Sequence, residues 1–241
     1  MAEYLGFIHI MGISVTIHEN EKARISFAEQ AYSELKRQIL TNELPHGSQF
    51  LEQEIAEQLS MSRTPTREAM VRLANEGLVE VRPRHGMRVL PISPKDMAEV
   101  YGIITALESS AAGILAGMDL SEDGLQSLMK AVDDMDTALE RDDLDRWVIA
   151  DYEFHRQMVV LTGSVRMLQL VDTFRDQIHR VRMTTLHMRP KPYKSNEDHR
   201  AVVAAILARD VKKARDIQRN HQEMAAKMLI KLLNENHMTH I

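Results

Sequence analysis

A short run of elements between Ser26 and Leu90 constrains the fold of this chain more than any other feature. Apolar residues recur there at helical spacing in three segments, and turn-forming residues at 44–47 separate the first two. Two alternating segments follow on either side of a polar turn, as in a β-hairpin. We expect helices over residues 26–40, 52–59 and 65–75 and a hairpin of 78–81 and 87–90. This order predicts a winged helix-turn-helix.

Arg63 and Arg67 stand at the start of the third expected helix. Residues four apart share one helix face, so these two guanidinium groups would lie about 6 Å apart. An arginine in a DNA major groove pairs bidentately with guanine, and a proline such as Pro65 is tolerated in a first helical turn. An isolated pair of this kind is more often a solvated surface feature. The hairpin that follows favours base reading instead.

Charge is distributed unevenly along the 241 residues. The formal net charge is −5, yet residues 60–88 hold six arginines and only three glutamates. From Ser93 onward the chain carries 20 lysines and arginines against 23 acidic residues. One basic module on a mildly acidic protein is typical of a DNA-binding domain joined to a domain with another role. The absence of cysteine excludes disulfides and thiolate metal ligands.

The remainder of the chain predicts helices only. Long helical patterns are interrupted by polar, glycine-containing or proline-containing breaks, which gives six or so helices. We therefore expect a mainly α protein in which a winged helix-turn-helix precedes an all-α bundle. The assigned boundaries are an N-terminal extension over 1–23, a DNA-binding domain over 24–91, a linker over 92–95 and a helical domain over 96–236.

No apolar run reaches the roughly 18–20 residues that span a bilayer. The extension contains a fairly apolar segment, residues 4–17, but this segment lacks the basic start and the small-residue cleavage site of a signal peptide. We therefore expect a cytoplasmic protein that does not bind a membrane.

Four residues in separate helical segments are candidate metal ligands. Asp151 and His155 are four residues apart on one helix face, and His199 and His221 belong to two later helices. An Asp–His pair is more often an ordinary hydrogen bond. If the three imidazoles and the carboxylate converge, they form a site suited to Zn²⁺, Mn²⁺, Ni²⁺ or Fe²⁺. Three further basic residues either line the same cavity or form a polar helix face: Arg175, His179 and Arg182.

An ordered set of motifs covers residues 31–91. It consists of Leu35-Lys36-Arg37-Gln38-Ile39-Leu40, Leu44-Pro45-His46-Gly47, Ile55-Ala56-Glu57-Gln58-Leu59, Ser62-Arg63-Thr64-Pro65-Thr66-Arg67-Glu68-Ala69, Leu73, Glu76-Gly77-Leu78-Val79 and Gly86. This set resembles the winged-helix domain of the GntR family of bacterial transcription regulators. The resemblance implies that Arg63 and Arg67 contact bases in the major groove, and that Thr64 and Thr66 bond phosphates.

The same resemblance concerns two further parts of the DNA-binding domain. It implies that the wing tip, His85-Gly86, approaches the minor groove, where a glycine lets the backbone come close. It also aligns Gln53 with a position at which members often carry a DNA-contacting arginine. Gln53 can still bond adenine or a phosphate, so we expect it to contact DNA with a different preference.

A second set of motifs covers residues 94–233. It consists of Asp151, Phe154-His155, Glu197-Asp198-His199-Arg200-Ala201-Val202, Ala205-Ile206, Asp210, Ala214-Arg215 and His221. These residues resemble the helical ligand-binding domain, called FCD, of FadR-type members of the family. The resemblance implies a small carboxylate or hydroxyacid effector bound at a metal held by Asp151, His155, His199 and His221.

The first helix of this domain departs from the family pattern. Ile103 or Ile104 stands where many relatives have an arginine that clamps the effector's carboxylate. The loss of such a clamp removes an interaction of roughly 1.5–3 kcal/mol. A simple organic acid is therefore a less secure expectation for this chain than for typical relatives.

We expect a homodimeric, metal-containing transcription regulator that responds to a small-molecule effector and acts as a repressor rather than an activator. Two-fold symmetry would present two recognition helices to a pseudo-palindromic operator in double-stranded DNA. We do not expect an enzyme. Two alternatives remain at this point: a metal-dependent hydrolase with Glu153 or Glu197 as general base, and a regulator whose metal is purely structural.

Overall fold

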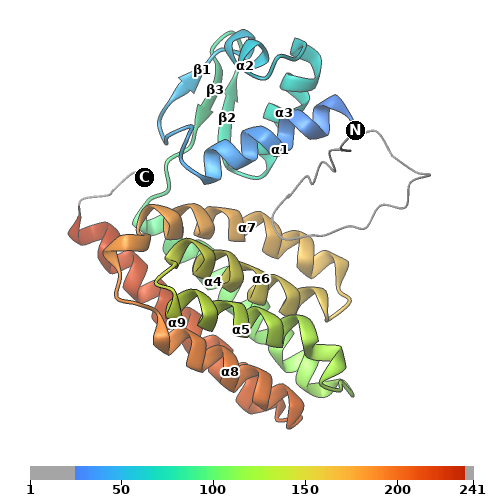
Figure 1. The fold of residues 1–241 in the computed structure, drawn as a ribbon. Coiled ribbons are helices and arrows are strands. Elements are labelled where there is room, and N and C mark those ends of the chain that lie inside the picture. The colour runs from blue at the N-terminus through green and yellow to red at the C-terminus, as the bar shows by residue number, and fades with distance from the viewer. Residues whose placement is uncertain (1–24, 237–241) are drawn as a thin grey trace, which may run out of the picture.

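The computed structural model describes residues 25–236, arranged as two bodies joined by a short connection (Figure 1). The smaller body, which corresponds to the expected DNA-binding domain, has three helices and a three-stranded sheet, and the larger body is a bundle of helices. The mainly α fold that the sequence predicts is confirmed. The expected extension over residues 1–23 lies outside the described residues.

Three helices of the DNA-binding domain pack onto one small core. They are α1 (Phe27–Leu40), α2 (Glu52–Gln58) and α3 (Arg63–Asn75), each within two residues of the predicted bounds. Leu35, Ile55 and Leu73 are fully buried, because the apolar residues of each helix fall on one face. Ser26 caps α1, since its hydroxyl accepts a hydrogen bond from the amide of Glu29.

The predicted hairpin is formed by β2 (Val79–Arg82) and β3 (Gly86–Val89). A third strand, β1 (Gln49–Phe50), pairs antiparallel with the other edge of β3, which gives the strand order β1-β3-β2. The sequence did not predict β1, because two residues are too short a segment to show a period. This strand anchors the base of the wing against the segment that precedes α2.

The helical domain contains six α-helices within the described residues, as predicted. They are α4 (Pro94–Gly117), α5 (Gln126–Glu140), α6 (Leu144–Val160), α7 (Val165–Thr184), α8 (Tyr193–Leu207) and α9 (Val211–Glu235), with short 3₁₀ turns η1 (Asp123–Leu125) and η2 (Leu186–Met188). The breaks begin new helices because their side chains cap exposed amides. Asp143, Ser164 and Asp210 each accept a hydrogen bond from the amide three residues further on.

Helix α4 begins inside the linker expected over residues 92–95. Pro94 already begins α4, and the hydroxyl of Ser93 accepts a hydrogen bond from the amide of Asp96, whose carboxylate accepts one from the amide of Ser93. This reciprocal pair is a capping box, which fixes the start of the helix. Only residues 90–93 therefore lie between β3 and α4.

Helix α4 is a core element of the bundle and packs most extensively against α9. By length and composition it is the one described helix that could cross a membrane. However, 56% of its most apolar window is buried inside the protein. That burial is typical of the central helix of a folded bundle.

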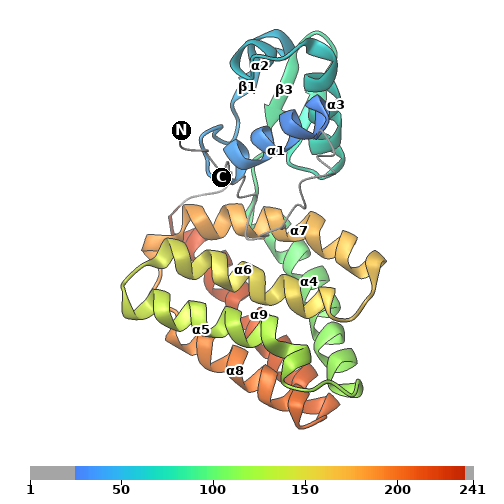
Figure 2. The ribbon, with the colours of Figure 1, turned by 45° about the vertical axis from the view of Figure 1, so that its right-hand side comes forward.

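Helix α7 is the part of the bundle that faces the DNA-binding domain, as both ribbon views show (Figures 1 and 2). Lys36 of α1 forms an ion pair with Asp176 of α7, with 2.5 Å between Nζ and Oδ2. Gln177 donates a hydrogen bond to the carbonyl of Glu76 at 3.3 Å, and Arg180 donates one to the carbonyl of Leu90 at 2.7 Å. The two domains are therefore joined by directed polar contacts as well as by the chain.

Candidate DNA interface and metal centre

The outer face of α3 carries the paired arginines. Arg63 and Arg67 are both exposed, and they line a hollow of about 670 Å³ together with Thr64, Glu68 and Asn75. The Nε of Arg63 donates a hydrogen bond to Glu52 of α2 at 2.8 Å, which links the start of α3 to α2. The Arg63 side chain is about 70% exposed. This face of α3 is therefore free to bind a polyanion.

The two threonines next to these arginines have different surroundings. Thr64 is exposed at the start of α3, whereas Thr66 is fully buried and donates its hydroxyl hydrogen bond to the carbonyl of Ser62 at 3.0 Å. The expectation that Thr66 bonds a phosphate is therefore wrong for this structure. Its hydroxyl instead ties the first turn of α3 to the preceding turn.

The other predicted DNA contacts lie on the surface around α2 and the wing. Gln53 is exposed on α2 and donates a hydrogen bond to Glu57, and His85 is exposed at the wing tip. Gly86 has a φ of +75°, and a Cβ at this position would lie 2.0 Å from the carbonyl oxygen of Phe50. The glycine is thus required by packing against β1, a reason that differs from the expected approach to a minor groove.

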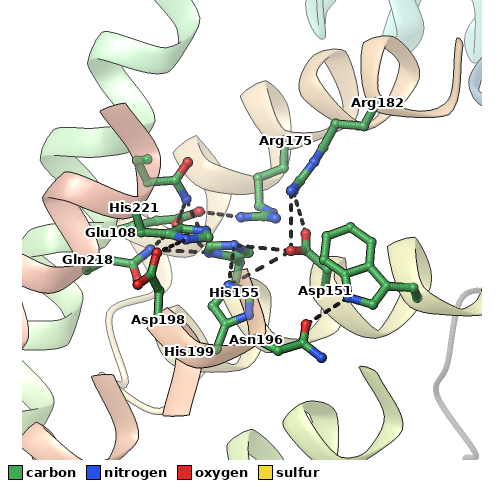
Figure 3. A network of polar contacts seen from close by, with 12 residues as sticks. Glu108, Asp151, His155, Arg175, Arg182, Asn196, Asp198, His199, Gln218 and His221 are labelled. Atoms are coloured by element: carbon green, nitrogen blue, oxygen red, sulfur yellow. Dashed lines mark hydrogen bonds and ion pairs between the residues drawn. The ribbon is translucent and has the colours of Figure 1, made fainter. Parts of the chain in front are cut away.

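In the helical domain the four predicted ligands converge. Asp151 and His155 come from α6, His199 from α8 and His221 from α9, and one donor atom of each lies within 4.8 Å of the others (Figure 3). All four side chains are buried, and their relative exposure is at most 6%. The apolar faces of α6, α8 and α9 pack into one core, and the four donors lie on the helix turns that face this core.

The imidazoles of His155 and His221 contact acidic residues through Nδ1, whereas His199 Nδ1 has no hydrogen-bond partner among the described residues. His155 Nδ1 lies 2.7 Å from Glu108 Oε2, so its Nε2 is turned toward His199 Nε2, 3.3 Å away. Both Nε2 atoms lie 3.9 Å from Asp151 Oδ1. His221 Nδ1 lies 3.6 Å from Asp198, and its buried Nε2 has no hydrogen-bond partner among the described residues.

The ionisation of the cluster favours metal ligation. Burial, with the charge of Arg175, lowers the pKa of His155 well below its usual value, and burial with the neighbouring His221 does the same for His199. Burial raises the pKa of Asp151, but the positive charges around it, of which Arg182 is the largest contributor, together outweigh burial and lower the pKa. Two neutral imidazoles beside a carboxylate are the protonation states that a divalent ion requires. The donor set and the unpartnered His221 Nε2 therefore fit such an ion.

Glu108 of α4 is a component of the cluster that sequence reasoning missed. Its carboxylate is fully buried, accepts hydrogen bonds from Gln218 and Gln222 of α9, and forms an ion pair with Arg175. A carboxylate that orients a metal-binding histidine is a recurrent arrangement in proteins. The only signal in the sequence was one acidic residue within an apolar helical pattern.

The three basic residues of α7 point into the protein and do not form a polar outer face. Arg175, His179 and Arg182 are all buried, with relative exposures of 3–7%. Arg182 pairs with Asp151, and the ring of His179 packs edge-on against Tyr152. Burial, with the charge of Arg182, lowers the pKa of His179 to about 4. On α4, Ile104 is buried and Ile103 is 40% exposed. Both side chains are apolar, so these two positions contribute no charge to the cluster.

A pocket of about 410 Å³ adjoins the cluster. His221, Asp198 and Arg182 line its inner part, and residues from the start of α6, the segment between η2 and α8, and α9 complete its walls. A small molecule in this pocket could therefore touch the buried donors directly.

Fold and sites together define a two-domain DNA-binding regulator, with an exposed reading helix and a buried cluster of polar donors. The chain belongs to the gntR family of bacterial regulatory proteins: the model of that family matches residues 27–89, and the FCD domain model matches residues 99–224. This agrees with the resemblance inferred from the motifs.

Relatives and solved structures agree with this membership. The chain is 44% identical over 136 residues to an uncharacterized HTH-type transcriptional regulator in the TAR-I ttuE-ttuC′ intergenic region of Agrobacterium vitis, covering 56% of this chain and 80% of that protein. It is 26% identical over 209 residues to the HTH-type transcriptional repressor RspR of Escherichia coli, covering 86% and 91%. The structure of E. coli McbR/YncC has the same fold, with a TM-score of 0.74 at 21% identity, covering 86% of this chain and 99% of that chain.

Proposed function

We propose that this DNA-binding transcription regulator is a homodimeric, cytoplasmic repressor whose operator affinity is controlled by a small molecule bound at a divalent metal in the helical domain. The observation that carries the proposal is the convergence of Asp151, His155, His199 and His221 in a buried cluster beside a pocket. Repression is supported by the likeness to RspR, which is named a repressor.

The metal would be held by the four converging side chains, and a bound divalent ion supplies Lewis-acid positions to which an oxygen of the effector can bind. Zn²⁺, Mn²⁺, Ni²⁺ and Fe²⁺ all suit this donor set. Glu108 and Asp198 hold His155 and His221 through their Nδ1 atoms, which keeps the Nε2 atoms available as ligands. Without Glu108 or Asp198 the rings would be free to turn away from the cluster.

Control of DNA binding requires that the pocket and the reading helix be mechanically connected, and α7 makes both contacts. Arg175 and Arg182 on one side of this helix form ion pairs with Glu108 and Asp151, whereas Asp176, Gln177 and Arg180 contact the DNA-binding domain. A ligand that draws Arg182 away from Asp151 would change the position of α7. The contacts to α1 and to Leu90 would then change with it, which favours one placement of the DNA-binding domain over another.

Operator recognition would use the exposed face of α3. Arg63 and Arg67 read guanines, Thr64 bonds a phosphate, and Gln53 and the wing residues His85 and Gly86 contact flanking DNA. A dimer would present two such faces to a pseudo-palindromic site.

The experiment that tests this function has two readouts. The protein is loaded with one equivalent of Zn²⁺ or Mn²⁺ and screened by thermal shift against small metabolites, and each stabilising compound is then titrated against the complex with operator DNA selected from a random pool. We expect at least one stabilising compound to weaken operator binding tenfold or more. A metal that stabilises the fold while no compound alters DNA affinity would leave the metal a purely structural role and would reject the proposal.

A further inference from the structure

Three charged residues meet at the junction of α1, the end of α3 and α7. Lys36 belongs to α1, Glu76 follows α3, and Asp176 belongs to α7. Helix α1 lies between the other two helices (Figure 1). Lys36 Nζ lies 3.0 Å from Glu76 Oε2 and 2.5 Å from Asp176 Oδ2. One cation is therefore shared between two carboxylates that belong to different domains.

Lys36 has as many polar partners as it has N–H donors. It donates hydrogen bonds to the hydroxyl of Tyr32 at 2.7 Å and to Glu76, and it forms the ion pair with Asp176. A lysine offers three donors in all. Asp176 forms no other ion pair with a residue between 25 and 236. The buried carboxylate of α7 therefore depends on Lys36 for its charge partner.

Glu76 has a second cation, Arg72 of α3. Arg72 Nε lies 3.6 Å from Glu76 Oε1, and Nη1 donates a hydrogen bond to Glu29 of α1 at 2.7 Å. The guanidinium carbon lies 3.5 Å from the centre of the Tyr32 ring, which is a cation–π contact. The hydroxyl of the same Tyr32 donates to Glu76 at 2.7 Å. Arg72 and Lys36 therefore approach Glu76 together, from either end of the Tyr32 side chain.

Arg72 also belongs to the DNA-facing side of α3. It lines the same hollow as Arg63 and Arg67, and its side chain is 49% exposed. An arginine on such a face gains affinity for DNA when it neutralises a phosphate and releases a condensed counterion. Arg72 thus has two classes of anionic partner, the carboxylates of its own domain and the phosphates of DNA.

The acidic groups at this junction outnumber the basic ones. Glu29, Glu76 and Asp176 share only Arg72 and Lys36. Glu29 is exposed, so water can replace its cation at little cost. Glu76 and Asp176 are more buried and therefore need a cation in place. Whichever of these two carboxylates holds Lys36 more closely decides how strongly Glu76 retains Arg72.

We propose that Arg72 contacts a DNA phosphate and that the contact between the domains controls its availability through Glu76 and Lys36. In the docked arrangement, in which Lys36 pairs with Asp176, Glu76 retains Arg72. Separation of α7 from α1 leaves Lys36 to Glu76 alone and frees Arg72 for DNA. Coupling between two sites is reciprocal, so DNA that binds Arg72 also loosens the Lys36–Asp176 pair.

This inference rests on the proposed function, because it names a route by which the helical domain controls operator affinity. An effector that weakens operator binding would act by favouring the docked arrangement. The route is a chain of contacts, and a chain of contacts becomes evidence of coupling only when the coupling between its ends is measured.

The test is a double-mutant cycle between Arg72 and Asp176, which form no ion pair with each other. Zinc-loaded full-length proteins are titrated with operator DNA selected from a random pool, and anisotropy of the labelled DNA reports binding. Asp176→Asn should strengthen binding about three- to tenfold in the wild-type background and should change nothing in the Arg72→Gln background. No gain in the first background, or the same gain in both, would overturn the proposal.

The salt dependence of the same titrations identifies the contact that changes. In Asp176→Asn the slope of log affinity against log salt should be steeper by about 0.9 for each Arg72 that reaches a phosphate. Glu76→Gln removes the carboxylate that retains Arg72, so it should steepen the slope as well. Neither substitution should steepen it once Arg72→Gln is present. A higher affinity with an unchanged slope would contradict a new phosphate contact.

Two controls separate this route from a general effect of charge. Asp172→Asn removes the same charge one turn earlier on α7, where the carboxylate pairs with Arg156 of α6 at 3.3 Å, and it should alter affinity little. In the Arg63→Ala background the gain from Asp176→Asn should persist, because Arg63 does not contact Glu76. An equal gain from Asp172→Asn, or loss of the gain in Arg63→Ala, would overturn the proposal.

Failure of this inference and failure of the proposed function give different results. An operator affinity that responds to a small molecule, together with no coupling between Arg72 and Asp176, rejects only the route named here. Coupling between the two residues, in a protein whose operator affinity no compound alters, supports the route and rejects control by a small molecule.

Discussion

Lys36 of α1 and Asp176 of α7 form an ion pair across the two domains, with 2.5 Å between Nζ and Oδ2. Asp176 is 2% exposed, and Lys36 also lies 3.0 Å from Glu76, which follows α3. Burial raises the pKa of Asp176 to about 6 although Lys36 opposes this. The pair therefore joins α7, which borders the buried Asp151/His155/His199/His221 cluster, to the domain that carries α3.

Lys36→Met should destabilise the protein by about 3 kcal/mol, because it leaves a buried carboxylate without its cation. Lys36→Met with Asp176→Leu should recover much of that loss, since neither charge remains. Chemical denaturation at pH 7.5 measures both. In the double variant we expect metal binding to persist and effector-induced DNA release to diminish; full release would show that the signal takes another route.

Glu108→Gln should weaken metal binding about 10- to 100-fold, because the amide orients His155 less firmly than the carboxylate does and leaves Arg175 without its partner. Competition with a chromophoric chelator measures the dissociation constant. Glu153→Gln on the same helix as His155 serves as the control and should bind metal normally. Equal metal dissociation constants for the two variants would show that Glu108 does not support metal binding.

The stability of the metal-free protein should fall as the pH decreases from 6.5 to 5. His179 has a pKa of about 4 in the folded protein and about 6.5 in the unfolded chain, so between these values only the unfolded state binds the proton. In His179→Gln the free energy of unfolding should decline less steeply as the pH falls. Its slope should be smaller than that of the wild type by about 1 kcal/mol per pH unit. Parallel curves for wild type and variant would indicate that His179 titrates normally in the folded state.

Arg63→Ala and Arg67→Ala should each cost about 1–3 kcal/mol in operator binding without unfolding the domain, because both side chains are exposed. Gel-shift titration at several salt concentrations measures the loss. Thr64→Ala should weaken binding to all sequences alike, as expected of a phosphate contact. Unchanged affinity in the arginine variants would place base reading elsewhere on the domain.

Local patterns were sufficient to predict most elements of the fold. The breaks at Asp143, Ser164 and Asp210 could be predicted because capping chemistry depends only on neighbouring residues. The strand β1 could not, because its pairing with β3 depends on a partner more than thirty residues away. For the same reason the packing of Gly86 against Phe50 could not be predicted, and its contact with DNA stays a prediction.

The candidate site was predictable only in part. Asp151 and His155 share a helix face, so their pairing could be predicted from spacing alone. His199 and His221 lie on other helices, and their convergence depends on how α8 and α9 pack. Glu108 was missed because a single charged residue in an apolar helix has no period. Its contacts with His155, Arg175, Gln218 and Gln222 form only when α6, α7 and α9 pack against α4.

The most direct test of the metal centre is the metal content of purified protein by elemental analysis, compared between wild type and His199→Ala/His221→Ala. His187→Ala, which alters an exposed histidine, is the matched control. We expect about one divalent ion for each wild-type and control chain and none for the double variant. Equal metal in all three proteins, or none in the wild type after growth with added Zn²⁺ and Mn²⁺, would contradict control of this regulator through a metal in its helical domain.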